Sequence, residues 1–544
     1  MIALAAGSPA VARVATVPSD PASAYVAARA AAISGNHAEA AGIYARLASS
    51  SNDTDLRQRA VSEAISAGDT KLALQLIRQL PATQLSVNSK LLLVADALRR
   101  GNDAEAIRLL GGAAGGADLG FWEPLIRGWN AAERRNAGEA LAAFAAVPRT
   151  SALAPFVDEQ SALILLKLGR TTEAEPYARR AIGVAGPREY RVRLALAGGF
   201  AAAGDRPRAL AMLEGISGDT TAIRQALEQG RLKRLMIDSS AEAFSEQLIA
   251  LALEMRRSQE SSTATPANIA QIARFSAPDS SSAAIVLGNL LADDGRLADA
   301  LNALASVSAD DPLKPEAVDA QARALIDAKR FSEALALAQA AVNRPGATGD
   351  DYARLGDVLG ELDRHAESAA AYAQAVDRFT KAGTTRVWPV LLLQASALET
   401  AGRWPEAKAV LSRATTLAPN EPLILNFLGY AKLEHGEDLD SAEAMIRKAS
   451  ELAPDDASIT DSLGWALYKR GRIDESIEVL QRAAIGDPAQ AEIQEHLGDA
   501  LFAAGRRFEA RFAWQAALAT AEADDSARIK AKIESGLTQA TAAR

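Results

Sequence analysis

The sequence predicts an all-α fold, a solenoid superhelix of about 13–14 helix-turn-helix repeats arranged in two lobes. Three observations support this prediction. A pattern of small residues recurs with a period close to 34 residues, and it is interrupted once, near the middle of the chain. Aromatic residues make up only 5% of a chain that is 49% hydrophobic, and alanine at this density is typical of closely packed helices. Each unit of a repeat array packs only on its neighbours, so 544 residues need not share one core.

The pattern is clearest near the C-terminus, where it occurs three times. Each unit has a glycine in a first apolar run, a turn glycine seven residues later, and two small residues in a second run. These positions are Gly429, Gly436, Ala442 and Ala449, then Gly464, Gly471, Ser476 and Ala483, then Gly498, Gly505, Ala510 and Ala517. The period of 34, with one extra residue in the first of these turns, is that of a tetratricopeptide repeat.

Residues 1–21 form a leader that precedes the repeats. A short apolar stretch is followed by Ala10-Val11-Ala12, which fits the small-residue cleavage site of a bacterial signal peptide. A charged region before the apolar stretch is missing. We interpret the leader as a signal-peptide remnant, with an alanine-rich tail as the alternative.

Residues 22–214 are predicted to form an N-terminal array. The small residue that opens each second helix recurs at spacings of 33 to 35, at Ala40, Ala73, Ala106, Ala140, Ala174 and Ala209. Most are preceded, five residues earlier, by a turn glycine, which tolerates the positive φ that ends a helix. A small side chain is expected wherever the two helices of a repeat cross closely. The glycine-rich stretch 111–116 lacks the lysine of a phosphate-binding loop, and we interpret it as an inter-repeat loop.

Residues 215–282 break the pattern. Apolar helices are predicted at 222–237 and 241–255, but no small-residue positions recur, and 258–268 and 276–282 are rich in Ser, Thr and Pro. We expect an irregular helical connector here, between the two lobes.

Residues 283–520 are predicted to form a C-terminal array, and 521–544 a capping helix with polar faces, as the end of a repeat array requires. The small residues that open the second helices are Ala300, Ala334, Ser368, Ala407, Ala442, Ser476 and Ala510. Most spacings are 34 or 35, and a longer loop at 380–389 accounts for the single spacing of 39.

The sequence contains no recognisable set of catalytic residues. The four histidines, His37, His365, His435 and His496, stand in no metal-ligand spacing, and the first three are expected in exposed turns. Cysteine is absent, and paired aspartates such as Asp455-Asp456 are expected to cap helices. We therefore predict no enzyme activity, no cofactor and no metal. The net charge of −9 argues against a nucleic-acid partner, and no apolar run is long enough to cross a membrane.

The predicted function depends on side chains that the repeats present on their surface. In a tetratricopeptide array the first helix of each repeat lines a groove, and counting from its glycine identifies the side chains that point into that groove. The predicted groove residues are Asn426, Tyr430, Asp461, Trp465, Tyr468, Lys469, Glu495, Asp499 and Phe502. Aromatic side chains with flanking charges suit a protein-binding surface. The alternative is that Trp465 and Tyr430 simply pack against the neighbouring helix.

Residues 420–520 resemble a bacterial family of long tetratricopeptide proteins that includes outer-membrane adaptors of a carboxyl-terminal processing protease. The resemblance is carried by N-F-L-G-Y (426–430), D-L-D-x-A (438–442), A-P-D-D (453–456), D-S-L-G-W (461–465) and G-R-R-x-E-A-x-x-x-W (505–514). It implies a non-catalytic periplasmic adaptor that binds this protease and presents its substrates, often cell-wall hydrolases. Such adaptors are lipoproteins, and this sequence, which has no cysteine, departs from them on this point unless its true N-terminus lies upstream.

Two other functions are compatible with the repeats. One is a subunit of an envelope machine that exports or secretes polysaccharide, and the other is a regulatory protein of the cytoplasm. We expect protein partners and a periplasmic location, with the cytoplasm as the alternative.

Overall fold

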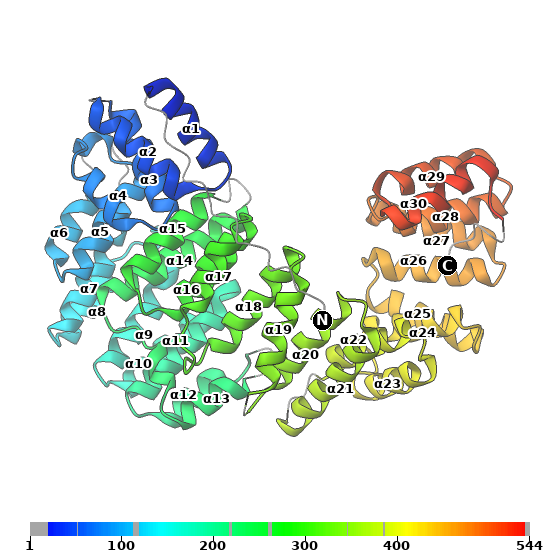
Figure 1. The fold of residues 1–544 in the computed structure, drawn as a ribbon. Helices are drawn as coiled ribbons and strands as arrows, with labels where there is room; N and C mark the ends of the chain where they lie inside the picture. The colour runs from blue at the N-terminus through cyan, green and yellow to red at the C-terminus, as the bar shows by residue number, and fades with distance from the viewer. Residues whose placement is uncertain are drawn as a thin grey trace, which may run out of the picture. The chain divides into compact units, whose positions relative to one another are not determined.

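A computed structural model describes residues 20–51, 53–111, 119–216, 220–258, 264–344, 346–383 and 387–538. Within these ranges every regular element is an α-helix or a short 3-10 helix, which confirms the predicted all-α solenoid. The chain divides into two compact units, residues 1–340 and 341–544 (Figure 1). Residues 1–19, which include the interpreted cleavage site, lie outside the described residues, as do 112–116 of the glycine-rich stretch and 259–263 of the Ser/Thr/Pro-rich stretch.

Unit 1 contains the helices up to α19, within which the chain passes into unit 2. They are α1 (Pro21–Ile33), α2 (His37–Ser50), α3 (Thr54–Ser66), α4 (Thr70–Ile77), α5 (Val87–Arg99), α6 (Asp103–Leu110), α7 (Glu123–Glu133), α8 (Ala137–Ala145), α9 (Val157–Lys167), α10 (Thr171–Ala185), α11 (Glu189–Ala202), α12 (Arg206–Leu213), α13 (Thr221–Glu228), α14 (Ser240–Ser258), α15 (Ala264–Ser276), α16 (Ser281–Asp293), α17 (Leu297–Ala305), α18 (Lys314–Asp327) and α19 (Phe331–Val342).

Unit 2 continues the helix pairs and ends in a single helix. Its helices are α20 (Gly349–Gly360), α21 (His365–Lys381), α22 (Trp388–Thr400), α23 (Trp404–Leu417), α24 (Pro422–Glu434), α25 (Leu439–Leu452), α26 (Ala457–Lys469), α27 (Ile473–Gly486), α28 (Ala491–Ala503), α29 (Arg507–Thr520) and α30 (Ala523–Ser535). The pairs α20/α21, α22/α23, α24/α25, α26/α27 and α28/α29 each pack as a hairpin.

The predicted small residues lie where the two helices of a pair cross. From Ala40 to Ala510 they are fully buried, and a side chain on the facing glycine would clash. An added Cβ at Gly464 would lie 2.6 Å from Leu480, and one at Gly498 would lie 2.4 Å from Trp514. Since real Cβ contacts are longer than this, the alternation of small and large residues sets the close approach of the helices.

The turn between paired helices keeps one geometry even where glycine is missing. Arg135, Lys329 and Asp363 stand five residues before a buried small residue and have φ of 60°, 56° and 56°. The turn at Arg135 is closed by a hydrogen bond from Asn136 N to Ala131 O (2.9 Å), the counterpart of the bond from Asn36 N to Ala31 O (2.8 Å) at a glycine turn. The tertiary packing of the pair imposes the left-handed residue, whatever its type.

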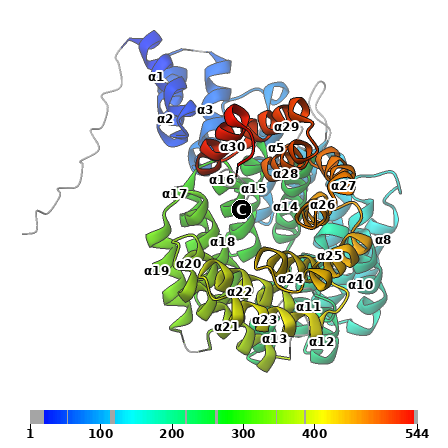
Figure 2. The same cartoon turned by 90° about the vertical axis from the view of Figure 1, so that its right-hand side faces the viewer.

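Residues 240–258 and 264–276 are not an irregular connector, which differs from the sequence-based expectation. They form a regular hairpin, α14 and α15, that packs back on α3, α5 and α7 of the preceding array. Figures 1 and 2 show this hairpin inside the turn made by α3–α11. Its ties to that array include a buried hydrogen bond from Ser66 Oγ to Asn268 Oδ1 (2.8 Å) and an edge contact of Trp122 with Phe244.

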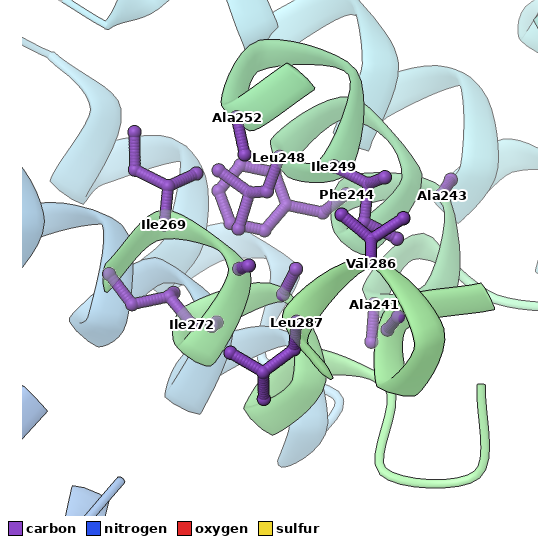
Figure 3. Packing of buried hydrophobic residues seen from close by; sticks show 14 of the residues in the cluster. Ala241, Ala243, Phe244, Leu248, Ile249, Ala252, Ile269, Ile272, Val286 and Leu287 are labelled. Atoms are coloured by element: carbon purple, nitrogen blue, oxygen red, sulfur yellow. The ribbon is translucent and has the colours of Figure 1, made fainter. Parts of the chain in front are cut away.

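The hairpin also explains why unit 1 has a continuous core. Figure 3 shows Phe244, Leu248 and Ile249 of α14 packed among Ile269 of α15 and Val286 of α16. One cluster of buried hydrophobic residues extends through these helices, from Ala24 to Ala320. The division of the chain therefore falls at 340/341, beyond the hairpin, and not at the predicted connector.

In unit 2 the buried hydrophobic residues form separate clusters, each spanning neighbouring repeats. One surrounds Trp404 and Leu428, another Trp465 and Ile446, and a third Trp514. This is the arrangement expected of a solenoid whose repeats contact only their neighbours.

Candidate protein-binding face

The first helices of successive repeats in unit 2 pack side by side. Helix α24 contacts α26, and α26 contacts α28. Together with α22 they make one surface, which we call the A-helix face. All nine predicted groove residues lie on α24, α26 or α28.

Trp465 is at the centre of this face and is buried, with 1% of its surface exposed. Its Nε1 donates to Glu434 Oε1 of α24 (2.9 Å). Its ring is nearly parallel to those of Tyr468 and His496, with centroid distances of 4.8 and 4.0 Å. Trp465 therefore occupies a packing position, as the alternative interpretation predicts. Its side chain contacts residues of α24, α26 and α28.

Two sequence offsets recur in these contacts. Glu434, Trp465 and His496 follow one another at intervals of 31 residues, whereas Glu434–Lys469 and Asp461–His496 are 35 apart. The offsets of 31 and 35 differ by four residues, which is about one helical turn. They therefore connect facing first helices at two positions that lie one turn apart. His496, for which the sequence predicts no role, is placed by this register.

His496 and Asp461 form a buried pair between α28 and α26. His496 Nδ1 lies 2.8 Å from Asp461 Oδ2, and Asp461 is 5% exposed. Burial lowers the pKa of His496, but the attraction of Asp461, Glu492 and Asp499 outweighs it, so that the net shift is upward. The pair thus favours an imidazolium facing a carboxylate.

Among the other histidines, His37 and His365 are half-buried, whereas His435 is exposed, as the sequence predicts. His37 lies 2.7 Å from Glu63 Oε2, and His435 is stacked on Trp404 with ring centroids 4.5 Å apart. Among the described residues, no cluster of three or more His, Asp or Glu is arranged to hold a metal ion.

The cap helix α30 covers the predicted groove residues of the last repeat. Lys532 of α30 is fully buried and bonds Asp499 through both carboxylate oxygens (2.8 and 2.7 Å) and Glu495 at 2.5 Å. Arg528 adds a second ion pair to Glu495. Phe502 packs beside Gly536, where an added Cβ would lie 2.8 Å from its ring. These three residues face the cap, in the position that a next first helix would occupy.

Five of the predicted groove residues keep accessible surface, namely Asn426, Tyr430, Tyr468, Lys469 and, beside the cap, Phe502. Lys469 Nζ lies 3.4 Å from Glu434 Oε2 and 5.0 Å from the centroid of the Trp465 ring. Burial raises the pKa of Tyr468, and the charge of Asp499 adds to this shift. Fewer than nine of the predicted groove residues are therefore accessible to a partner. Binding of a partner to them stays a prediction.

Unit 1 contains two adjoining polar cavities of about 110 and 340 Å³ beside the turn between α15 and α16. Arg234 lines both of them and is paired with Asp310 at 2.7 Å. Arg191, in the smaller cavity, is paired with Glu246 at 2.5 Å. Each of these two arginines is therefore neutralised by a carboxylate.

No helix among the described residues combines the length and the apolar composition that crossing a membrane requires. This finding concerns the part of the chain that the structure describes.

Comparison with known proteins identifies the repeats. A family model described as a tetratricopeptide repeat matches residues 272–350, 353–422, 392–457 and 462–527. The first match begins within α15, inside the segment for which the sequence predicts a connector. No curated protein matches the chain.

Solved structures that are similar include the Cut9–Hcn1 hetero-tetramer of the APC/C, at 14% identity over 96% of this chain and 97% of that one, with a TM-score of 0.39. A tetratricopeptide repeat protein from Parabacteroides merdae is 12% identical over 47% of this chain and 97% of its own, also with a TM-score of 0.39. YrrB, described as having an unusual peptide-binding site, is 16% identical over 34% of this chain and 91% of its own, with a TM-score of 0.26. The matched residues of this chain are tetratricopeptide repeats, and its described part is a tetratricopeptide-like α-solenoid that indicates a protein–protein interaction scaffold.

Proposed function

We propose that this protein is a non-catalytic scaffold of the bacterial envelope that binds partner proteins along the A-helix face of unit 2. The observation that carries the proposal is the placement of Tyr430, Tyr468 and Lys469 on consecutive, mutually packed first helices, with surface left accessible on each. Aromatic side chains held on rigid helices supply large contact areas at low entropic cost, which is typical of the residues that dominate protein interfaces.

The proposed partner is a carboxyl-terminal processing protease together with its substrates, and the proposed location is the periplasm. Both rest on the motifs of residues 420–520. In the structure these motifs have structural tasks that any tetratricopeptide array needs, such as the cap of α26 by Asp456, so they support the adaptor role only through the resemblance.

The test is a binding measurement with the full chain. Purified carboxyl-terminal processing protease is titrated against wild type, against the double variant Tyr430→Ala/Tyr468→Ala, and against Arg482→Ala. Arg482 is exposed on the second helix α27 and serves as the matched control. We expect the double variant to bind at least about tenfold more weakly, with unchanged helix content. Equal binding by all three proteins would contradict a role for the A-helix face, and fractionation of tagged protein with the cytosol would contradict the location.

A further inference from the structure

Two exposed aromatic side chains lie next to each other on α29, the second helix of the last repeat. Phe508 and Phe512 are 75% and 56% exposed, and their rings meet edge to face with centroids 4.8 Å apart. They are four residues apart and share one side of the helix, whereas the buried Trp514 and Ala517 lie on the other side. The packing of α29 on α28 and α30 therefore does not require either phenylalanine.

The repeat pattern does not require aromatic residues at these positions either. Counted from the buried small residue of each second helix, the equivalent positions in α25 and α27 are Asp440, Ala444, Asp474 and Glu478. All four of these residues are exposed. Since α25 and α27 form the same kind of hairpin with acidic or small residues at these positions, the fold does not explain Phe508 and Phe512.

The charge beside the two rings is positive. Arg507 and Arg511 are exposed and follow one side of the aromatic pair, four residues apart. Neither guanidinium forms an ion pair or a hydrogen bond with a residue that the structure describes, although Arg507 Cζ lies 5.6 Å from the centroid of the Phe502 ring. The neighbouring Glu509 is already paired with Arg506. The exposed side of α29 thus combines a large apolar surface with two cations that lack a counter-charge.

We propose that this surface, which we call the α29 face and which is formed by Arg507, Phe508, Arg511 and Phe512, binds a segment of a partner protein that combines acidic and apolar side chains. Aromatic and arginine side chains are enriched at protein interfaces. Carboxylates of the partner supply the counter-charge that the chain itself does not give these two arginines. The α29 face lies on a second helix, whereas the A-helix face is built from first helices. The proposal therefore does not depend on the function proposed above.

Charge separates this occupant from two others. A bilayer of anionic lipid faces much more of the molecule than α29, and the net charge of −9 opposes its approach. A peptide segment meets mainly the local charge, because charges farther away than about 8 Å are largely screened at physiological ionic strength. A second copy of the chain bound through the same face would bring the arginines of both copies into one interface and add no carboxylate that is free to pair with them.

The test titrates the full chain against a short fluorescein-labelled peptide of glutamate and leucine, with glutamate–serine and lysine–leucine peptides as comparisons. Phe508→Ser/Phe512→Ser removes both rings, and Ile485→Ser is its matched control because Ile485 is 81% exposed on the second helix α27. Arg511→Gln removes one cation, and Arg482→Gln, at an exposed position of α27, is the control for it.

We expect the double variant to bind the glutamate–leucine peptide at least about tenfold more weakly than wild type, and Arg511→Gln about fivefold more weakly. Both controls should bind as wild type does, and neither comparison peptide should reach the affinity of the glutamate–leucine peptide. Equal affinity of the double variant and Ile485→Ser overturns the proposal, as does equal binding of all three peptides.

The same measurements separate the other occupants and the function proposed above. If wild type does not bind the glutamate–leucine peptide, the proposal is overturned. Vesicles of anionic phospholipid, or a dimer seen by sedimentation velocity, then identify the occupant when the double variant loses that interaction. If Tyr430→Ala/Tyr468→Ala abolishes peptide binding and the α29 double variant keeps it, the peptide binds the A-helix face and this proposal is overturned. If the peptide binds the α29 face as expected but the protease does not bind the A-helix face, this proposal stands and the proposed function fails.

Discussion

His496 lies face to face with Trp465, with ring centroids 4.0 Å apart and ring planes inclined by 12°. The same imidazole reaches Asp461 through Nδ1, and the same indole reaches Glu434 through Nε1. Two stacked rings therefore connect carboxylates of α24 and α26 with α28. Their protonation and packing control how firmly these repeats hold together.

The His496–Asp461 pair makes the stability of unit 2 depend on pH. Because the pKa of His496 is raised above its ordinary value of 6.5, the pair contributes stability below that value and loses it as the pH rises through the folded-state pKa. Each unit of upward shift corresponds to about 1.4 kcal/mol. Urea unfolding between about pH 5.5 and 8.5 should show this loss for wild type and not for His496→Gln. His365→Gln, at a helix start with its ring partly exposed, should behave as wild type.

Replacing Trp465 tests whether it is part of the core. Trp465→Ala should lower the free energy of unfolding by about 3–5 kcal/mol, because it leaves a cavity and removes the donor to Glu434. Tyr468→Ala, at a half-buried position, should cost clearly less. Denaturant unfolding followed by circular dichroism measures both. If Trp465→Ala lowered the free energy of unfolding by less than about 1 kcal/mol, Trp465 would not be a core residue and would belong to the binding surface.

The cap depends on one buried lysine. Lys532→Met leaves Glu495 with only Arg528 and leaves the buried carboxylate of Asp499 without its ammonium, which should cost about 3–5 kcal/mol. Lys530→Met, two residues away on the exposed side of α30, should change the stability by less than about 0.5 kcal/mol. Similar unfolding midpoints for the two variants would contradict the role of Lys532 as the anchor of the cap.

The glycines that face second helices should not accept a methyl group. Gly498→Ala places a Cβ 2.4 Å from the Trp514 ring and should destabilise the protein by about 1–3 kcal/mol. Gly42→Ala, in the interior of α2 with no atom near the added Cβ, should instead stabilise the protein by up to about 1 kcal/mol. Thermal unfolding distinguishes the two directions.

Contacts between near neighbours could be predicted from the sequence. The period of 34 located the helix pairs, and the buried positions of Ala40 and Ser476 follow directly from it. Turn residues such as Arg135 were harder to anticipate, since nothing in an arginine indicates a positive φ. There the packing of the helix pair outweighs the preference of the residue.

Contacts between distant segments could not be predicted. The hairpin of α14 and α15 lacks the small-residue pattern because it packs on α3, α5 and α7 and not only on its sequence neighbours. The groove positions were counted within each first helix, and this counting ignores what covers them. Lys532, 33 residues beyond Asp499, covers that position, whereas the offsets of 31 and 35 would have pointed to Lys530 and Glu534.

The continuous core of unit 1 and the separate clusters of unit 2 have different consequences for how the gene can change in length. In unit 2 the clusters around Trp404, Trp465 and Trp514 each involve adjacent repeats, so a duplicated or deleted segment of 34 codons would leave every surviving cluster with equivalent neighbours. In unit 1 the same event between α3 and α7 would displace Ser66 or Trp122 from the hairpin that both of them contact. Homologous chains should therefore vary in repeat number after residue 340 and keep a constant length before it.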